Sequence, residues 1–270
     1  MDLRNIGKGL LSLMGATVFS LAISSSQAQT VGYFTDFDVA NTLPASSITA
    51  NSLTPLRISD ITTFAFNSVK IVLIDETSNA GYSAGLSGRF AALETYVTNG
   101  GILVVHDRST GNTSNALLPG NYNTQLVRGL HSDINVVTSG NLLINGPFGT
   151  ITNNNLDGGN SSSHGYATIG VLPAGAVNYL TDGSGPAGNS VGFSYSLGSG
   201  FVYFSSIPLD FYRGGGSAFD TIYGNNVIAL ANNFSRTSTS VPEPGSVALL
   251  VATGSASVFA FKRSRRNMKK

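Results

Sequence analysis

Residues 69–75 read VKIVLID, and the expected fold of the chain is built around this run. The run is almost wholly apolar, is rich in β-branched side chains, and stops where the chain turns acidic at Asp75 and Glu76. A continuous apolar run of this length is typical of a strand that is buried on both faces, as the strands of parallel sheets are. We therefore predict a β-strand in a parallel sheet that has helices on both faces.

A helix and a second strand follow. Apolar residues recur at helical spacing and give a helix one apolar stripe: Leu86, Phe90, Leu93 and Val97. The glycines at 100–101 end this helix, because glycine adopts the left-handed conformation of a C-cap. Residues 102–105, ILVV, predict the next buried strand, which ends at His106 and Asp107. The resulting βαβ unit sets the two strands parallel through a right-handed crossover.

Shorter elements are expected around this unit. Strand-like runs occupy residues 31–35, 134–137, 141–144, 176–180, 191–197 and 201–204, and the last two form a hairpin. Helical segments are predicted at residues 61–66, 124–130 and 223–234. The passages 36–55 and 146–166 are too polar to form core and are expected to be loops. We predict a three-layer α/β sandwich with a mainly parallel central sheet over residues 29–234.

Composition excludes several function classes. The 270 residues carry a formal net charge of +1, but eight of the cations lie at the two ends. Without them, and without Asp2 and Glu243, 7 basic and 12 acidic residues remain, a balance of −5. No basic patch is left to neutralise phosphates, so a nucleic-acid partner is disfavoured. The chain has no cysteine, which excludes disulfides, a thiol nucleophile and thiolate metal ligands.

The N-terminus predicts export. Arg4 and Lys8 precede an apolar segment at 9–23, and small residues stand where a signal peptidase reads. We expect residues 1–28 to be a signal peptide with an apolar helix, cleaved by signal peptidase after Ala28.

The C-terminus has three parts that predict membrane insertion. After a Ser/Thr linker at 235–241 comes Pro242-Glu243-Pro244, where prolines hold the chain extended. The uncharged run 246–261 follows and spans about 24 Å as a helix, slightly less than a hydrocarbon core. Six cationic residues within 262–270 should stay on the cytoplasmic side of this transmembrane helix.

This order of parts resembles the PEP-CTERM sorting signal of Gram-negative bacteria. The resemblance covers residues 241–266 and rests on Pro242, Glu243 and Pro244, the apolar run and the basic end. It implies recognition by an exosortase-type membrane peptidase, transient anchoring in the inner membrane, and delivery to the cell surface or the extracellular matrix. An ordinary C-terminal anchor is the alternative.

The core resembles the class I glutamine amidotransferase-like, or ThuA-like, α/β fold. The stretches that carry this resemblance are 71–75, the helix ending at 100–101, 102–106, 200–204 and the closing helix. True amidotransferases have a nucleophilic cysteine at the strand end where this chain has His106 or Asp107. Glutaminase activity is therefore excluded. The ThuA-like resemblance implies that a histidine can stand at this position.

Candidate site residues follow the two central strands. Because ligands bind beyond the carboxyl ends of parallel strands, Asp75, Glu76, His106 and Asp107 are expected to converge on one crevice. His106 with Asp107 and Asp75 could act in acid/base catalysis, or a histidine could bind a metal. The alternative is that Asp75 and His106 only tie down loops.

Other polar residues are weaker candidates. His164 is a second candidate metal ligand in the polar stretch, and His131 lies near Asp133. Arg108 and Arg128 could meet an anionic sugar, although a solvated surface is the simpler interpretation. The sequence has no zinc motif, P-loop or nucleophile elbow, and no cofactor is expected.

Two functions remain in competition. The first is a non-catalytic, envelope-sorted surface or matrix protein associated with exopolysaccharide, as the sorting-signal resemblance implies. The alternative is a carbohydrate-directed hydrolase or isomerase that uses His106 and Asp107. A catalytic site would bring Asp75, His106 and His164 into one water-accessible pocket.

Overall fold

The computed structural model describes residues 29–38, 40–112, 116–157, 162–183, 189–209 and 219–238. The predicted signal peptide with Ala28, the Pro242-Glu243-Pro244 motif and the apolar run 246–261 lie outside these residues. Within the described part of the chain, no helix is long and apolar enough to cross a membrane.

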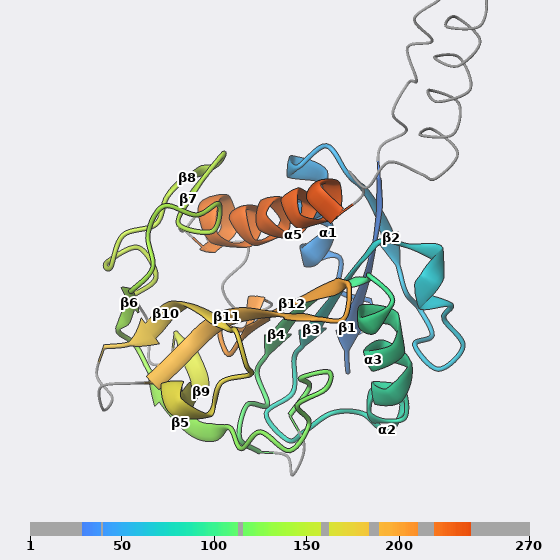
Figure 1. Ribbon diagram of the computed structural model, residues 1–270, viewed down its shortest axis with the longest axis horizontal. Coiled ribbons are helices and arrows are strands. Elements are labelled where there is room, and N and C mark those ends of the chain that lie inside the picture. The colour runs from blue at the N-terminus through green and yellow to red at the C-terminus, as the bar shows by residue number, and fades with distance from the viewer. Residues whose placement is uncertain are drawn as a thin grey trace, which may run out of the picture.

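A ten-stranded mixed sheet forms the centre of the molecule (Figure 1). Five neighbouring strands are parallel: β2 (Thr54–Arg57), β1 (Thr30–Asp36), β3 (Ile71–Glu76), β4 (Ile102–Asp107) and β12 (Gly200–Ser205). The others extend it with antiparallel pairings: β11 (Asn189–Leu197), β10 (Val177–Asp182), β6 (Ile134–Val136), β9 (Ser163–Thr168) and β5 (Val127–His131). The predicted parallel sheet is thus half of a larger mixed one.

Helices cover both faces of the parallel half, as the apolar runs predict. On one face lie α1 (Leu43–Ala50) and α5 (Gly224–Ser238), which follows the π-helical turn η3 (Phe219–Tyr223). On the other lie the 3₁₀ turn η1 (Phe66–Ser68), α2 (Ala84–Ser87) and α3 (Phe90–Thr98). The remaining elements are η2 (Ile169–Val171) and the small hairpin of β7 (Asn145–Gly146) and β8 (Gly149–Thr150). The three-layer α/β sandwich is confirmed.

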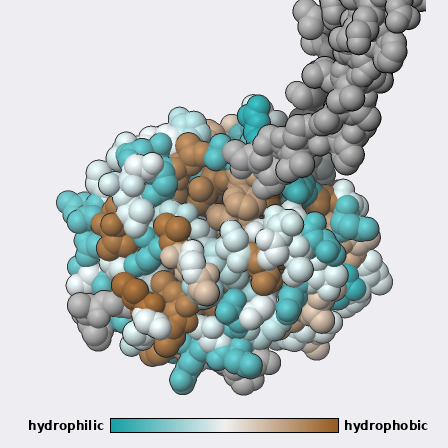
Figure 2. Space-filling view, viewed as in Figure 1, coloured by the Kyte–Doolittle hydropathy of each residue, from teal (hydrophilic) through white to brown (hydrophobic). Residues whose placement is uncertain are grey.

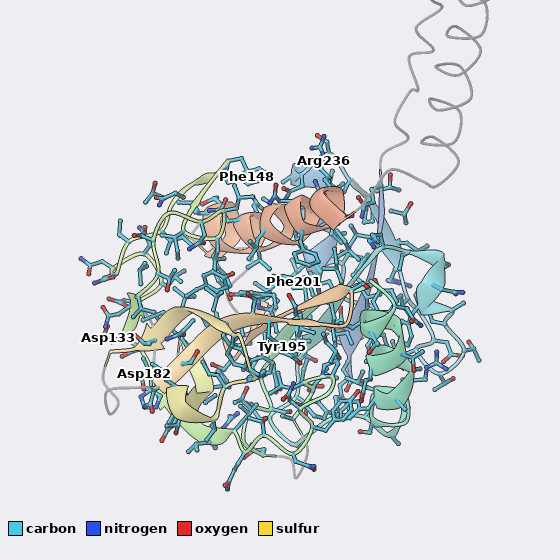
Figure 3. All side chains as sticks on the ribbon, viewed as in Figure 1. Asp133, Phe148, Asp182, Tyr195, Phe201 and Arg236 are labelled. Atoms are coloured by element: carbon cyan, nitrogen blue, oxygen red, sulfur yellow. The ribbon has the colours of Figure 1, made fainter. Side chains whose placement is uncertain are left out.

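Alternation along the strands divides the core into two. Leu73, Val104 and Tyr203 pack under α5, where Phe201 stacks on Phe234 with ring centroids 4.6 Å apart (Figure 3). Val72 of β3 and Val105 of β4 belong to the second cluster, together with Leu93 of α3. Each of these strand residues is fully or almost fully buried, because successive side chains of a covered strand point into opposite cores.

The βαβ prediction is confirmed, with one change in its helix. β3 and β4 pair in parallel, with Ile71 beside Ile102 and Asp75 beside His106. The predicted helix through Leu86 and Val97 is broken into α2 and α3 at Gly88 and Arg89. Glycine costs about 1 kcal/mol in a helix interior, which favours a break there.

Several predictions for shorter elements are wrong. The helix predicted at 61–66 is absent from the structure: residues 61–63 form a turn, in which Asp60 Oδ1 accepts a hydrogen bond from the Thr62 amide at 2.9 Å, and Phe66 begins η1. The predicted strand 141–144 is likewise a turn, in which Asn141 Oδ1 accepts from Leu143 and Ile144. The predicted loop 36–55 contains α1 and part of β2, and the expected helix at 124–130 is replaced by β5.

The antiparallel half carries most of the exposed large apolar side chains. These are Val127, Leu130, Val137, Ile169, Val171 and Val177, each at least 37% exposed. Figure 2 shows hydrophobic residues in separate groups among polar ones rather than as one continuous face. Scattered apolar side chains of this kind are normal on protein surfaces and need no special explanation.

Candidate functional site

The four predicted site residues at the ends of β3 and β4 are neighbours in the sheet, but their side chains do not meet in one place. Asp75 pairs with His106 and Glu76 with Asp107 across β3 and β4. Because neighbouring residues of a strand point to opposite faces, the two pairs lie on opposite faces of the sheet. The ring of His106 contacts Tyr223 near α5, whereas Asp107 meets Tyr82 on the α2 and α3 face. The four side chains therefore form two sites rather than one crevice.

His106 is built into the core under α5. Its exposed fraction is 0%, and its ring centroid lies 6.1 Å from that of Tyr203 and 5.7 Å from that of Tyr223. Nδ1 lies 3.0 Å from the carbonyl oxygen of Ile207. A carbonyl only accepts, so this nitrogen carries a proton and His106 ties the end of β4 to the segment after β12.

A chain of hydroxyl groups lies beside His106. Tyr223 donates to Ser205 Oγ at 2.8 Å, and Ser205 donates to the carbonyl of Val191 at 3.1 Å. The Tyr203 and Tyr223 oxygens are 3.0 Å apart, so Tyr203 is the donor in that pair. Burial raises the pKa of both tyrosines, which keeps both phenols protonated. These hydroxyl groups are fully buried, and the rings of Tyr203 and Tyr223 contact that of His106.

On the other face, Glu76 forms a carboxyl pair with Asp36 of β1. Glu76 is fully buried, and its Oε1 accepts from the Ser78 amide at 2.6 Å. Burial, followed by a hydrogen bond with Asp36 and repulsion from its charge, raises the pKa of Glu76 to about 10. Asp36 Oδ2 accepts from the Ser83 amide at 2.8 Å. At neutral pH Glu76 is therefore a neutral acid that shares its proton with the Asp36 carboxylate.

Asp107 of β4 lies beside Glu76, so Asp36, Glu76 and Asp107 form a row of acidic residues across three neighbouring strands. Its Oδ2 accepts from the Tyr82 hydroxyl and its Oδ1 from the Ser109 amide, both at 2.8 Å. Burial raises the pKa of Asp107 to about 6, although hydrogen bonds from Tyr82, Ser109 and Thr110 oppose the rise. A carboxyl group that titrates near neutral pH is the usual mark of an acid/base residue, but here it is wholly buried.

His164 lies on β9 rather than in a loop, and it joins separate segments. Its backbone amide donates to the Ser206 carbonyl at 2.9 Å. Its Nδ1 lies 3.1 Å from Asn79 Oδ1 and 3.3 Å from Arg128 Nη2. Burial and the charges of Arg128 and Arg108 lower the pKa of His164 to about 4, so its imidazole is neutral at pH 7.

His131 has a different partner from the one nearby in the sequence. Its Nδ1 lies 2.7 Å from Oδ2 of Asp182 on β10. The backbone carbonyl of Asp133 instead accepts a hydrogen bond from the Gly183 amide at 3.0 Å; Figure 3 labels both aspartates. Among the described residues, no group of three His, Cys, Asp or Glu side chains is placed to hold a metal ion. That His106 or His164 binds a metal ion therefore stays a prediction, and neither belongs to such a group among the described residues.

Two residues of this site were not predicted from the sequence: Asp36, which pairs with Glu76, and Tyr82, which donates to Asp107. Asp36 was visible as the acidic end of an apolar stretch, but its role depends on β1 lying next to β3. Tyr82 lies in the segment before α2, and no local pattern connects it to Asp107.

Two hollows lined by described residues lie away from the strand carboxyl ends. One, about 550 Å³, lies between η1 and α3, near the amino-terminal ends of β3 and β4. The other, about 440 Å³, lies between α5 and the β7–β8 hairpin. Neither is lined by Asp75, His106 or His164.

No family model matches this chain, and no curated protein matches it. Solved structures do. A cytoplasmic protein from Salmonella typhimurium matches with a TM-score of 0.53 at 10% identity, over 76% of this chain and 98% of its own. A second cytoplasmic protein of that species matches with a TM-score of 0.50 at 10% identity, over 75% and 99%. A ThuA-like protein from Bacteroides uniformis matches with a TM-score of 0.40 at 11% identity, over 77% and 91%. At these identities the Salmonella proteins show a shared fold and nothing about activity.

Proposed function

We propose that this protein is a non-catalytic α/β domain that is exported and sorted at the cell envelope, where it associates with exopolysaccharide. The proposed route uses signal peptidase at Ala28 and an exosortase-type peptidase at Pro242-Glu243-Pro244, with a transient stay in the inner membrane. The signal peptide and the sorting signal are both inferred from the sequence.

One observation favours the non-catalytic assignment. His106, the best candidate for an acid/base residue, has an exposed fraction of 0% and an Nδ1 hydrogen bond to the Ile207 carbonyl. A group that must exchange protons with a substrate needs to reach it within hydrogen-bonding distance or through one water. In the described structure this side chain instead holds two strand ends together.

The proposal is tested by mass spectrometry of the protein purified from its natural host. We expect the chain to begin at Gln29 and to lack residues 262–270, because both peptidases have acted. An intact C-terminus in a strain that has the sorting peptidase would make the tail an ordinary membrane anchor instead.

A second candidate is a carbohydrate-directed hydrolase or isomerase of ThuA-like type. It is favoured by the pKa of Asp107, about 6, because a carboxyl group near neutral pH suits acid/base work. Product release from oligosaccharides, followed by NMR, would test it. Turnover that is present in the wild type and lost in Asp107→Asn, with folding intact, would promote the enzyme over the non-catalytic protein.

A further inference from the structure

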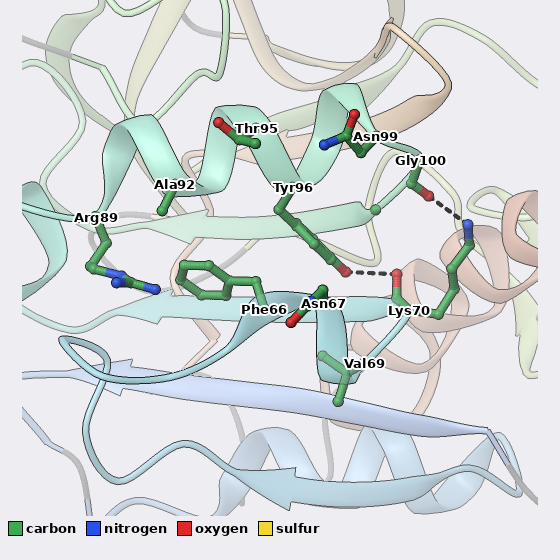
Figure 4. A pocket seen from close by; sticks show the side chains of 11 residues that line it. Phe66, Asn67, Val69, Lys70, Arg89, Ala92, Thr95, Tyr96, Asn99 and Gly100 are labelled. Carbon is green, nitrogen blue, oxygen red and sulfur yellow. Dashed lines mark hydrogen bonds between the residues drawn. The ribbon is translucent and has the colours of Figure 1, made fainter.

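A groove runs between α3 and η1 at the edge of the sheet opposite His106 and Asp107. It has a volume of about 550 Å³ and is lined by 11 residues (Figure 4). One wall comes from α3, the other from the segment around Phe66 and Asn67, and Gly100 closes one end. A groove of this size falls within the range of small-molecule sites.

Two cations stand at opposite ends of this groove (Figure 4). Lys70 Nζ donates to the Gly100 carbonyl at 2.6 Å. Arg89 donates to the carbonyls of Thr62 at 3.1 Å and Phe64 at 2.6 Å, and its guanidinium lies 4.9 Å from the centroid of the Phe66 ring. Carbonyls and an aromatic ring orient these groups but do not neutralise them.

Within the part of the chain that the structure describes, no acidic side chain pairs with the positive charge of the groove. None of the 11 lining residues, all of them described, is acidic. Neither Lys70 nor Arg89 forms an ion pair with another described residue. The ammonium group of Lys70 has three donors, of which one is used, and Arg89 Nε is buried with no hydrogen-bond partner in the described structure. This contrasts with the balance of −5 over the chain without its two ends.

Neutral polar groups lie between the two cations. Asn67, Thr95 and Asn99 supply amide and hydroxyl groups, and Val69 and Ala92 supply apolar surface (Figure 4). Tyr96 braces the floor, because its hydroxyl donates to the Lys70 carbonyl at 2.7 Å. A ligand that matches this lining carries negative charge, several hydroxyl groups and some apolar ring surface.

We propose that this groove binds an acidic saccharide, with its carboxylate groups at Lys70 and Arg89 and its hydroxyl groups at Asn67 and Asn99. The choice of a saccharide rests on the proposed association with exopolysaccharide, whereas the need for negative charge rests on the groove alone. A free organic carboxylate offers the same charge without the hydroxyl-bearing ring.

Isothermal titration calorimetry on the full chain, in mild detergent at low ionic strength, tests the proposal. The probes are trigalacturonate, its uncharged methyl ester and citrate. We expect trigalacturonate to bind and the other two to bind at least about tenfold more weakly, because each lacks one half of the match. Absence of trigalacturonate binding, equal binding of the ester, or equal binding of citrate would overturn the proposal.

A matched pair of variants locates the binding. Thr95 and Thr98 are both exposed on α3, but only Thr95 lines the groove. In Thr95→Glu the new carboxylate competes with the ligand for the two cations, so trigalacturonate should bind at least about tenfold more weakly. Thr98→Glu should bind like the wild type. If the wild type binds but both variants behave alike, the saccharide association stands and the groove is the wrong site.

Discussion

The carboxyl pair of Glu76 and Asp36 predicts an unusual dependence of stability on pH. The side chain of Glu76 has a reference pKa of 4.5, and in the folded protein its pKa is about 10. The folded state therefore holds a proton that the unfolded state releases. The contribution of Glu76 to the free energy of unfolding is therefore fully present below pH 4.5. It decreases progressively as the pH rises from there through about 10, because the unfolded state becomes ionised first.

The size of the effect follows from these two values. Each pKa unit corresponds to about 1.4 kcal/mol, and pH 7 lies about 2.5 units above the unfolded pKa. Proton uptake by Glu76 thus lowers the free energy of unfolding at pH 7 by about 3.5 kcal/mol relative to low pH. Glu76→Gln removes this cost, because the amide is neutral at every pH and still donates a hydrogen bond to Asp36.

Denaturant unfolding of the full chain at several pH values measures the effect. We expect Glu76→Gln to have nearly the wild-type free energy of unfolding near pH 5 and to exceed it by about 3.5 kcal/mol at pH 7, with a gap that widens at pH 9. Asp107 affects the slope of the free energy of unfolding against pH only below about pH 6. Measurements above pH 7 therefore report the effect of Glu76 without that of Asp107. Thr98→Ala, on the exposed side of α3, is the control and should keep the wild-type slope, because it removes no titratable group. If the gap between Glu76→Gln and the wild type does not grow with pH, Glu76 is not held protonated in the folded protein.

Two further substitutions test the packing and the role of His106. Leu93 has an exposed fraction of 0%, so Leu93→Ala should lower the free energy of unfolding by about 2 to 5 kcal/mol. An unchanged midpoint of denaturant unfolding would mean that α3 is not packed on the sheet as described. His106→Ala should cost about 1 to 3 kcal/mol, because the Ile207 carbonyl loses its donor, and should leave trigalacturonate binding unchanged in calorimetry. A stable His106→Ala variant that had lost an oligosaccharide-directed activity would favour the enzyme.

The βαβ unit could be predicted because its sequence pattern is local. The runs 69–75 and 102–105 are apolar on both faces, and glycines at 100–101 mark the helix end. Burial on both faces leaves no alternation to interpret, so length and β-branched content decide in favour of strands. The structure confirms both strands and their parallel pairing.

The antiparallel half could not be predicted in the same way. β9 reads SHGYAT, which has too little apolar content to predict a strand, yet it pairs with both β11 and β5. α1 was missed for a related reason, since Pro44, Ser47 and Ile48 are the residues it buries. Such elements are stabilised by partners distant in the chain, and tertiary packing overrides their weak local preference.

The polar ends of β3 and β4 could be predicted from the sequence, but which side chains meet there depends on strand order. Because β1 lies between β2 and β3, Asp36 meets Glu76 and creates a neutral acid that no single stretch of sequence indicates. The alternation of β3 and β4 then separates Asp75 and His106 from Glu76 and Asp107.

This separation has a consequence for where a ligand can bind. At the carboxyl edge, the four charged or titratable side chains that end β3 and β4 are all fully buried, so in the described structure they serve strand pairing and loop closure. At the amino edge, Lys70 immediately precedes β3 and faces a groove with no acidic residue in its lining. A solvated cation that faces a hollow can exchange water for an anionic ligand at low cost, whereas a buried carboxyl pair must first break its own hydrogen bonds. The proposed ligand binding at the amino edge is therefore compatible with an intact core, and we expect Thr95→Glu, at an exposed position, to weaken it without unfolding the protein.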